Sequence, residues 1–200
     1  MMPAMTAGRG RQRLWLLLVI AAVIVLPIAW YLISPLFLSK TVSEAFPMSA
    51  NATLPAGMTR EQAEKAMMEA SKVNSAMTET MPAAAATVLV QGTFGAVDGV
   101  HKGEGTATLY RVGQDRVLRF DPFKVTNGPD LYVYLSGHAA PRSREQLHEG
   151  GAFEVGRLKG NIGAQNYTLP ADLDPSKFKS AVIYCRRFHV VFSTAELTSR

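Results

Sequence analysis

The stretch DLYVYLS, residues 130–136, has the alternation that defines the fold of this chain. Successive side chains of a β-strand point to opposite faces, so Leu131, Val133 and Leu135 share one face and Tyr132 and Tyr134 share the other. The preceding Asn-Gly-Pro-Asp, residues 127–130, is typical of a compact turn. The stretch therefore predicts a strand that turns one face toward an apolar core.

Runs of the same character recur from about residue 83 onward: AATVLVQGTF, GTATLYRV, RVLRFDPFKV and SAVIYCRRFHVVFS. They are rich in β-branched and aromatic residues and are separated by Gly, Pro, Asn and Asp. No long helical pattern lies between them, which disfavours a parallel α/β sheet. Residues 86–200 are thus predicted to form an all-β domain, an antiparallel β-sandwich or flattened barrel. We expect its core to draw on Leu89, Leu109, Leu118, Leu131, Val133, Leu135, Ile183 and Val191.

An apolar segment near the N-terminus, LWLLLVIAAVIVLPIAWYLI at residues 14–33, contains no charged side chain. At about 1.5 Å per residue its helix would be roughly 30 Å long, the thickness of a bilayer's hydrocarbon core. Trp15, Trp30 and Tyr31 lie near its ends, where aromatic rings prefer the membrane interface. The length favours a transmembrane signal anchor over residues 14–38. A long cleaved signal peptide is the alternative, and in both cases the rest of the chain is exported.

The charges that flank this segment predict its orientation. Arg9, Arg11 and Arg13 precede it, and only Lys40 follows closely, so residues 1–13 should form a cytoplasmic basic tail of a single-pass protein in the cell membrane. The C-terminal domain is then extracytoplasmic. The formal net charge of +5 comes in part from these arginines, and the other basic residues are interspersed with acids. A nucleic acid partner is therefore not expected.

Residues 39–85 are expected to be a juxtamembrane linker followed by a short stalk helix. Pro47 and Pro55 indicate an irregular connector. Thr59 and Gln62 have capping-box spacing, and an apolar stripe at three- and four-residue intervals then extends the predicted helix over residues 59–81. Several members of the stripe are methionines, but without repeated close spacing or a histidine they indicate packing rather than copper binding.

Known catalytic and cofactor motifs are missing from the sequence. It contains no CxxCH motif for covalent c-type haem, no HExxH, no P-loop and no G-x-S-x-G. The four histidines are far apart in the chain, so no metal site is predicted. The cofactor stays unknown, and whether the protein is an enzyme stays open.

Cys185 is the only cysteine, so it cannot form a disulfide within the chain. If residues 180–194 were one extended strand, Arg187 would share the face of Cys185 at about 7 Å along it. Nearby cations stabilise thiolates, which makes Arg187 a candidate support for a reactive thiol. A free cysteine is also among the residues most often buried as a small hydrophobe. The residues alone leave these two interpretations open.

Several motifs, in order, resemble the electron-transfer DM-thirteen domain family, which is associated with DOMON domains. They are Gly92-Thr-Phe, His101 with Gly105-Thr-Ala, the run GPDLYVYL from Gly128, Leu158-Lys-Gly with Gly163 and Tyr167, and Val182-Ile-Tyr-Cys. The resemblance covers roughly residues 90–198. It implies a small β domain in which one cysteine, matching Cys185, acts in redox chemistry. We take His101 as a candidate neighbour of that thiol from another strand. No DOMON-like companion is seen, so we expect any redox partner to be another protein.

The sequence therefore predicts a membrane-anchored extracytoplasmic β domain with a thiol-based redox or electron-transfer role. The alternative is a non-catalytic extracellular binding or adhesion module that uses its loops. For that alternative the polar stretch at residues 136–151, which includes His138 and His148, would be the functional loop.

Overall fold

The computed structural model describes residues 8–34, 38–47, 59, 61–62, 65 and 86–199. These residues divide into two compact units, Met1–Leu38 and Ser39–Arg200, each of which is described by itself. The predicted stalk helix over residues 59–81 lies almost wholly outside the described part. Within it, the Thr59 amide donates to Gln62 Oε1 at 3.0 Å and the Gln62 amide donates to Thr59 Oγ1 at 3.2 Å, the two hydrogen bonds of a capping box.

The first unit contains one long helix, α1, Gly8–Ile33. It begins before the predicted apolar segment, so Arg11 and Arg13 belong to the helix rather than to a separate tail. Its stretch Arg11–Ile33 is long and apolar enough to cross a membrane, and its side chains are exposed. An N-terminal signal sequence passes the same test of length and composition as a membrane anchor. Pro27 lies within the helix.

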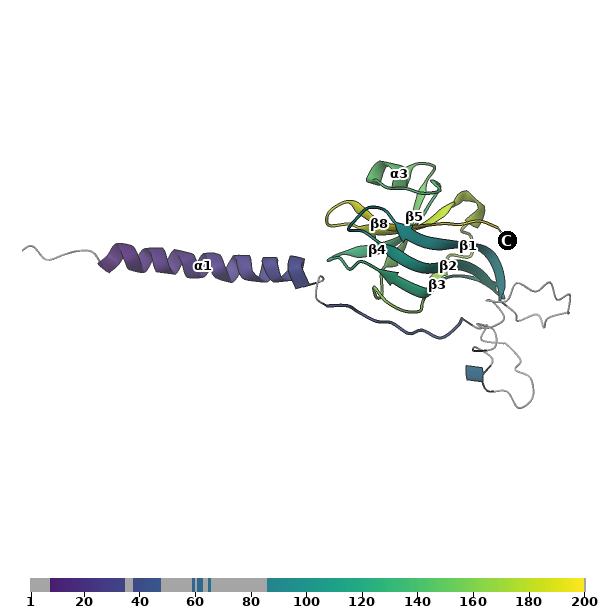
Figure 1. The fold of residues 1–200 in the computed structure, drawn as a ribbon, viewed down its shortest axis with the longest axis horizontal. Helices are drawn as coiled ribbons and strands as arrows, with labels where there is room; N and C mark the ends of the chain where they lie inside the picture. Colours follow the sequence, from purple (N-terminus) through teal and green to yellow (C-terminus); the bar gives the residue numbers. More distant parts are fainter. Residues whose placement is uncertain are drawn as a thin grey trace, which may run out of the picture. The chain divides into compact units, whose positions relative to one another are not determined.

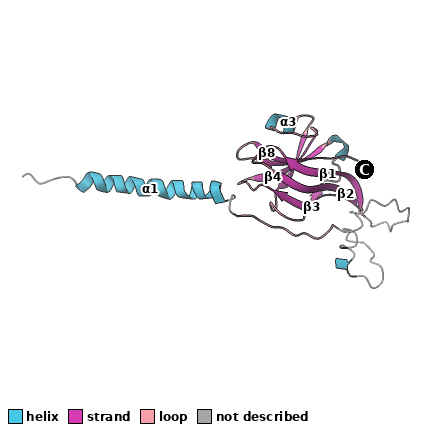
Figure 2. Ribbon diagram, in the orientation of Figure 1, coloured by secondary structure: helices cyan, strands magenta, loops and turns pink. Residues whose placement is uncertain are grey.

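The second unit is an eight-stranded antiparallel sheet that curves into a nearly closed barrel (Figures 1 and 2). The spatial order is β5-β4-β7-β8-β1-β2-β3-β6, and the edge strands β5 and β6 contact each other. The strands are β1 Thr87–Ala96, β2 Gly103–Val112, β3 Asp115–Val125, β4 Leu131–Ser136, β5 Ala152–Arg157, β6 Gln165–Leu169, β7 Ser180–Cys185 and β8 Val190–Glu196. The predicted all-β class is confirmed, in its flattened-barrel form.

The interior of the barrel is filled from both halves of the sheet. Six of the expected core residues lie in the main buried cluster: Leu109, Leu118, Leu131, Val133, Leu135 and Ile183. Leu89 is partly buried against this cluster, and Val191 belongs to a second cluster on the outer face of β7 and β8. The alternation of residues 130–136 is confirmed, because Leu131, Val133 and Leu135 face inward and Tyr134 joins the outer cluster.

Two segments differ from the sequence-based expectation. Residues 180–193 are two antiparallel strands, β7 and β8, joined by a turn at residues 186–189. The polar stretch 136–151 contains a short helix, α3, Arg144–His148, whose amide at Gln146 is capped by the Ser143 side chain. Leu147 of α3 is fully buried among Tyr134, Val182 and Tyr184, so this helix covers the outer face of β4 and β7 (Figure 1).

Residues 39–47, which we call the strap, lie along the barrel beside the segment that leads into β6. The Val42 amide donates to the Ile162 carbonyl and the Glu44 amide to the Ala164 carbonyl, both at 2.9 Å. Phe46 is buried against the ring of Tyr110, with centroids 5.0 Å apart. The strap thus packs as part of the barrel unit, although its sequence indicated only an irregular linker.

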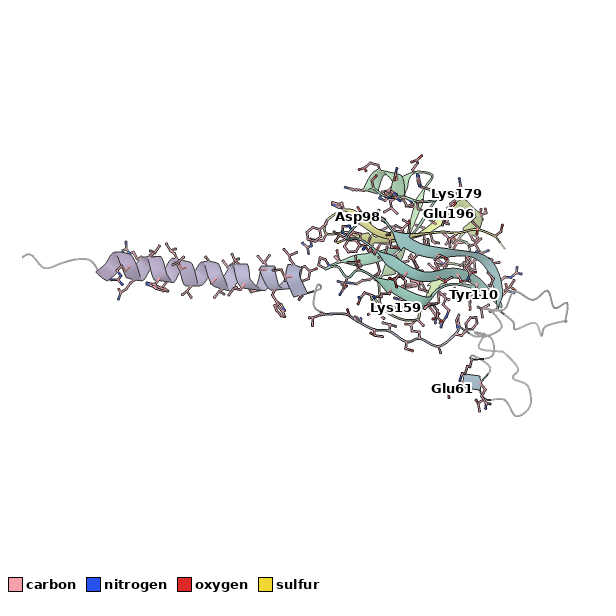
Figure 3. The ribbon with its side chains drawn as sticks, in the orientation of Figure 1. Glu61, Asp98, Tyr110, Lys159, Lys179 and Glu196 are labelled. Atoms are coloured by element: carbon pink, nitrogen blue, oxygen red, sulfur yellow. The ribbon has the colours of Figure 1, made fainter. Side chains whose placement is uncertain are left out.

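Charged groups hold the strap in place. Lys159 Nζ lies 2.8 Å from Glu44 Oε1, and Figure 3 labels Lys159 on the side of the barrel along which the strap runs. Burial opposes ionisation of Glu44, but hydrogen bonds from Lys159 and from the Asn166 amide lower the pKa of its carboxyl below the ordinary value. The buried Arg119 donates to the carbonyls of Glu44 and Ala45, at 3.2 and 3.1 Å.

Candidate functional site

Cys185 is the last residue of β7, and its side chain is fully buried in the main core cluster. It lies opposite Leu131 on β4 and opposite Val190 on β8. The strand is buried along its whole length because it has a neighbour on each side and apolar clusters on both faces. The thiol is therefore packed in apolar surroundings at the end of the barrel where β7 turns into β8.

An open cleft adjoins this end of the barrel. Its volume is about 440 Å³, and it lies between the start of the strap, the turn before β4 and the segment that follows β5. Basic residues line it: Lys40, Arg157 and Lys159. Leu131, the strand partner of Cys185, also contributes to its wall. Cys185 itself does not line the cleft, and Leu131 is the lining residue that pairs with it across the sheet.

Arg187 does not continue the β7 alternation, because the strand ends at Cys185 and Arg187 lies in the turn. Its side chain is exposed and lines a second groove, on the outer face of the sheet, together with Tyr184 and His189. The spacing argument that placed Arg187 and Cys185 on one face therefore does not apply to the folded chain.

His101 lies just before β2, in the turn that follows β1. Its ring packs against Phe192 with centroids 4.3 Å apart, and Phe192 belongs to the same core cluster as Cys185. Its Nδ1 lies 2.7 Å from Asp98 Oδ2, and its backbone amide donates to Asp98 Oδ1. His101 thus covers the core at this end of the barrel and is held there by Asp98, which Figure 3 labels.

The Asp98–His101 pair gives a testable pH dependence. The hydrogen bond from the His101 side chain, with those from the amides of His101 and Val100, lowers the pKa of Asp98 from 3.8 to about 2. A carboxyl with a depressed pKa stabilises the fold above its unfolded value, and this contribution is lost as the pH falls through about 2. Carboxyl NMR of the full chain should place the Asp98 midpoint near this value. In His101→Ala the midpoint should move up toward 3.8, and an unchanged midpoint would contradict the pairing.

Metal binding has no obvious place in the described part of the chain. Among those residues, no three side chains of His, Cys, Asp or Glu lie close enough together to hold an ion. Two features near the sequence-predicted residues could take part in chemistry: the buried thiol of Cys185 and the basic cleft that Leu131 helps to line. Sequence reasoning missed the cleft, because Lys40 and Lys159 come together only when the strap docks on the barrel.

The fold and the site together define the class of this protein: a small antiparallel β-barrel with a single thiol in its core, in a chain that also contains an apolar helix, Gly8–Ile33. The chain belongs to the electron transfer DM13 family, whose sequence model matches residues 93–197, just over half of its length. No curated protein and no solved structure matches the chain. The family match begins within β1, so the strap and α1 lie outside it.

Proposed function

We propose that this protein is a membrane-anchored redox protein whose barrel lies outside the cytoplasm and exchanges disulfides with a partner through Cys185. The observation that carries the proposal is that the single cysteine of an electron transfer DM13 domain pairs across the sheet with Leu131, a residue that lines a basic cleft. The anchor is α1, and the arginines at its N-terminal end support a cytoplasmic N-terminus.

The exchange needs a disulfide on the partner as its co-reactant. The sulfur of Cys185 attacks one partner sulfur, so that a new S–S bond joins the two proteins and the partner's own S–S bond breaks. The released partner sulfur leaves as a thiolate with the electron pair of that bond, and it takes up the proton that Cys185 loses. A second thiol of the partner side then attacks the mixed disulfide and restores the Cys185 thiol. An oxidising compartment outside the cytoplasm supplies such disulfides.

Burial of Cys185 requires that the barrel opens locally before this reaction, since a thiol in apolar surroundings is otherwise inert. The end of β7 is the place where such opening is easiest. β7 stops at Cys185, the turn after it is exposed, and Phe188 in that turn has 52% of its surface exposed. If the Leu131 side chain moves away from the core on the side of the cleft, the Cys185 thiol is uncovered. The remaining hydrogen bonds between β7 and β4 stay in place.

The test measures how Cys185 reacts with a thiol reagent in the full chain, in detergent, under native conditions. We expect reaction through local opening, at a free energy below that of global unfolding. Leu131→Ala should accelerate labelling about tenfold more than Leu135→Ala, although both remove a buried leucine of β4 and should cost a similar 2–5 kcal/mol of stability.

The control protein Cys185→Ala should show no labelling and no disulfide-linked adduct on oxidation of native membranes. If Cys185 reacts only at the free energy of global unfolding, and Leu131→Ala and Leu135→Ala accelerate labelling equally, the thiol is a packing residue. The redox proposal would then be wrong.

A further inference from the structure

A second concave site lies on the opposite surface of the sheet from the buried thiol. It is an open groove of about 700 Å³ on the outer face of β4 and β7, beside α3 (Figure 1). Its lining residues come from three separate parts of the chain: α3, the start of β4, and the end of β7 with the turn that follows it. The proposed redox function uses none of them.

Positive charge predominates along this groove. Arg144, Arg186 and Arg187 line it, and among the residues that line it the one carboxylate is Asp130. Asp130 Oδ1 lies 3.6 Å from Arg157 Nη2, so its charge is already partly balanced by a fourth arginine outside the groove. Three guanidinium groups, one from α3 and two from the β7–β8 turn, therefore line one hollow, and although Arg186 also pairs with Glu154 the excess positive charge favours anions.

The floor of the groove is aromatic and is held rigidly. The rings of Tyr134 and Tyr184 meet edge to face with centroids 5.7 Å apart, and the Arg186 guanidinium lies 4.4 Å from the centroid of Tyr132. The Tyr134 hydroxyl donates to Glu154 at 2.6 Å, and Glu154 also pairs with Arg186 at 3.2 Å. Tyr134 and Tyr184 are buried, with 8% and 4% of their surfaces exposed, so the half-buried ring of Tyr132 is the apolar surface that lies next to the cations.

His189 is the strained residue of the groove. It is the last residue of the β7–β8 turn, and its φ of 56° lies in the left-handed region that residues other than glycine adopt rarely. Glycine or asparagine usually fills such a turn position. Its Nδ1 lies 3.1 Å from the Tyr184 hydroxyl oxygen, so the strained backbone presents an imidazole at the aromatic floor. The positive φ serves the β7–β8 turn, and it also sets the position from which the His189 side chain lines the groove.

We propose that this groove binds a small anionic ligand that carries a carboxylate or phosphate group on a ring. The anionic group lies between Arg144 and Arg187, the ring lies against Tyr132, and His189 contributes a hydrogen bond. The inference goes beyond the redox proposal, because Cys185 faces the interior and does not line this groove.

The test is calorimetric titration of the full chain in detergent with phenyl phosphate, benzoate, inorganic phosphate and phenol. Phenyl phosphate or benzoate should bind most tightly, and whichever binds better identifies the anionic group. Inorganic phosphate, which lacks the ring, should bind about tenfold more weakly, since one aromatic contact is worth about 1 kcal/mol or more. Phenol, which has no charge at neutral pH, should not bind measurably.

Three variants separate binding from folding. Arg187→Ala should weaken phenyl phosphate binding about tenfold, as expected for loss of one charge-assisted hydrogen bond. Arg111→Ala removes the same charge from the exposed surface of β2 and should leave binding unchanged. His189→Gly relieves the strained φ, so it should keep or raise the melting temperature while it weakens binding about fivefold.

Two results would overturn the proposal. One is the absence of saturable binding of both phenyl phosphate and benzoate below about 10 mM, which corresponds to negligible affinity. The other is an equal loss of binding in Arg187→Ala and Arg111→Ala, which would show that the anions respond only to net charge.

Discussion

Replacement of Phe120 by alanine is expected to lower the free energy of unfolding of the barrel by about 3–5 kcal/mol. Phe120 is fully buried on β3. Its ring meets Phe94 at 4.9 Å, Phe123 at 5.0 Å and Tyr167 at 5.5 Å between centroids, so it joins β1, β3 and β6. Truncation leaves a cavity among rings that cannot easily move together, because they are held by three paired strands.

The measurement is thermal unfolding of the full chain, followed by far-ultraviolet circular dichroism at a wavelength dominated by strands. For a unit of this size the loss should lower the melting temperature by roughly 10 °C. Phe188→Ala is the matched control, since Phe188 lies in the β7–β8 turn with 52% of its surface exposed and should change stability little. Equal effects of the two substitutions would show that the aromatic cluster does not hold the barrel together.

Local alternation explains why much of the barrel was predictable. In residues 130–136 every second side chain faces the core, and this period of two is a property of any strand that is buried on one side. Runs of β-branched and aromatic residues between Gly, Pro, Asn and Asp located β1, β2 and β3. β5 was not indicated, because its residues are only half buried or exposed and its sequence, AFEVGR, has a glycine near the end.

The turn between β7 and β8 shows where local pattern fails. Arg186-Arg-Phe-His189 contains none of the residues that usually mark turns, so the sequence suggested one continuous strand. The chain reverses there because Cys185 and Val190 pair across the turn and His189 accepts a positive φ. Because a histidine takes the position that glycine or asparagine usually fills, the sequence did not predict this turn. It therefore did not predict that Arg187 lies on the outer face either.

The candidate site depended on contacts between residues far apart in the chain. Cys185 is buried because β7 pairs with both β4 and β8. The residues near Cys185 in the sequence do not indicate this pairing. The cleft beside it forms only when Lys40 of the strap comes next to Asn161, whose Oδ1 accepts from the Lys40 amide at 2.7 Å. The residue types of the strap alone indicated a linker.

The strap itself provides the second large expected effect. Gly163→Ala should destabilise the barrel by at least about 2 kcal/mol and release the strap from it. Gly163 has a φ of 97°, and a Cβ placed on it would overlap the Val42 carbonyl oxygen. That oxygen belongs to the backbone, so no side chain can move aside to relieve the clash. The hydrogen bonds of the Val42 and Glu44 amides to Ile162 and Ala164 should be lost with it.

Substitutions at two other glycines separate the two causes of this loss of stability, the backbone conformation and the clash with the strap. Gly151 has a φ of 96°, but a Cβ placed on it would meet nothing within 4 Å, so Gly151→Ala measures the cost of the backbone conformation alone. Gly95 has neither a positive φ nor a close neighbour, so Gly95→Ala should be nearly neutral. The difference between Gly163→Ala and Gly151→Ala then reports how much the docked strap stabilises the barrel.

Limited proteolysis of the full chain in detergent is the measurement that identifies strap release. New cleavage within residues 39–47 is expected in Gly163→Ala and in neither control. Because Lys40 and Lys159 of the basic cleft are positioned by the docked strap, release should also alter access to Cys185, and its rate of labelling should change in Gly163→Ala alone. Equal stability and equal cleavage in all three variants would show that residues 39–47 are not held by the barrel.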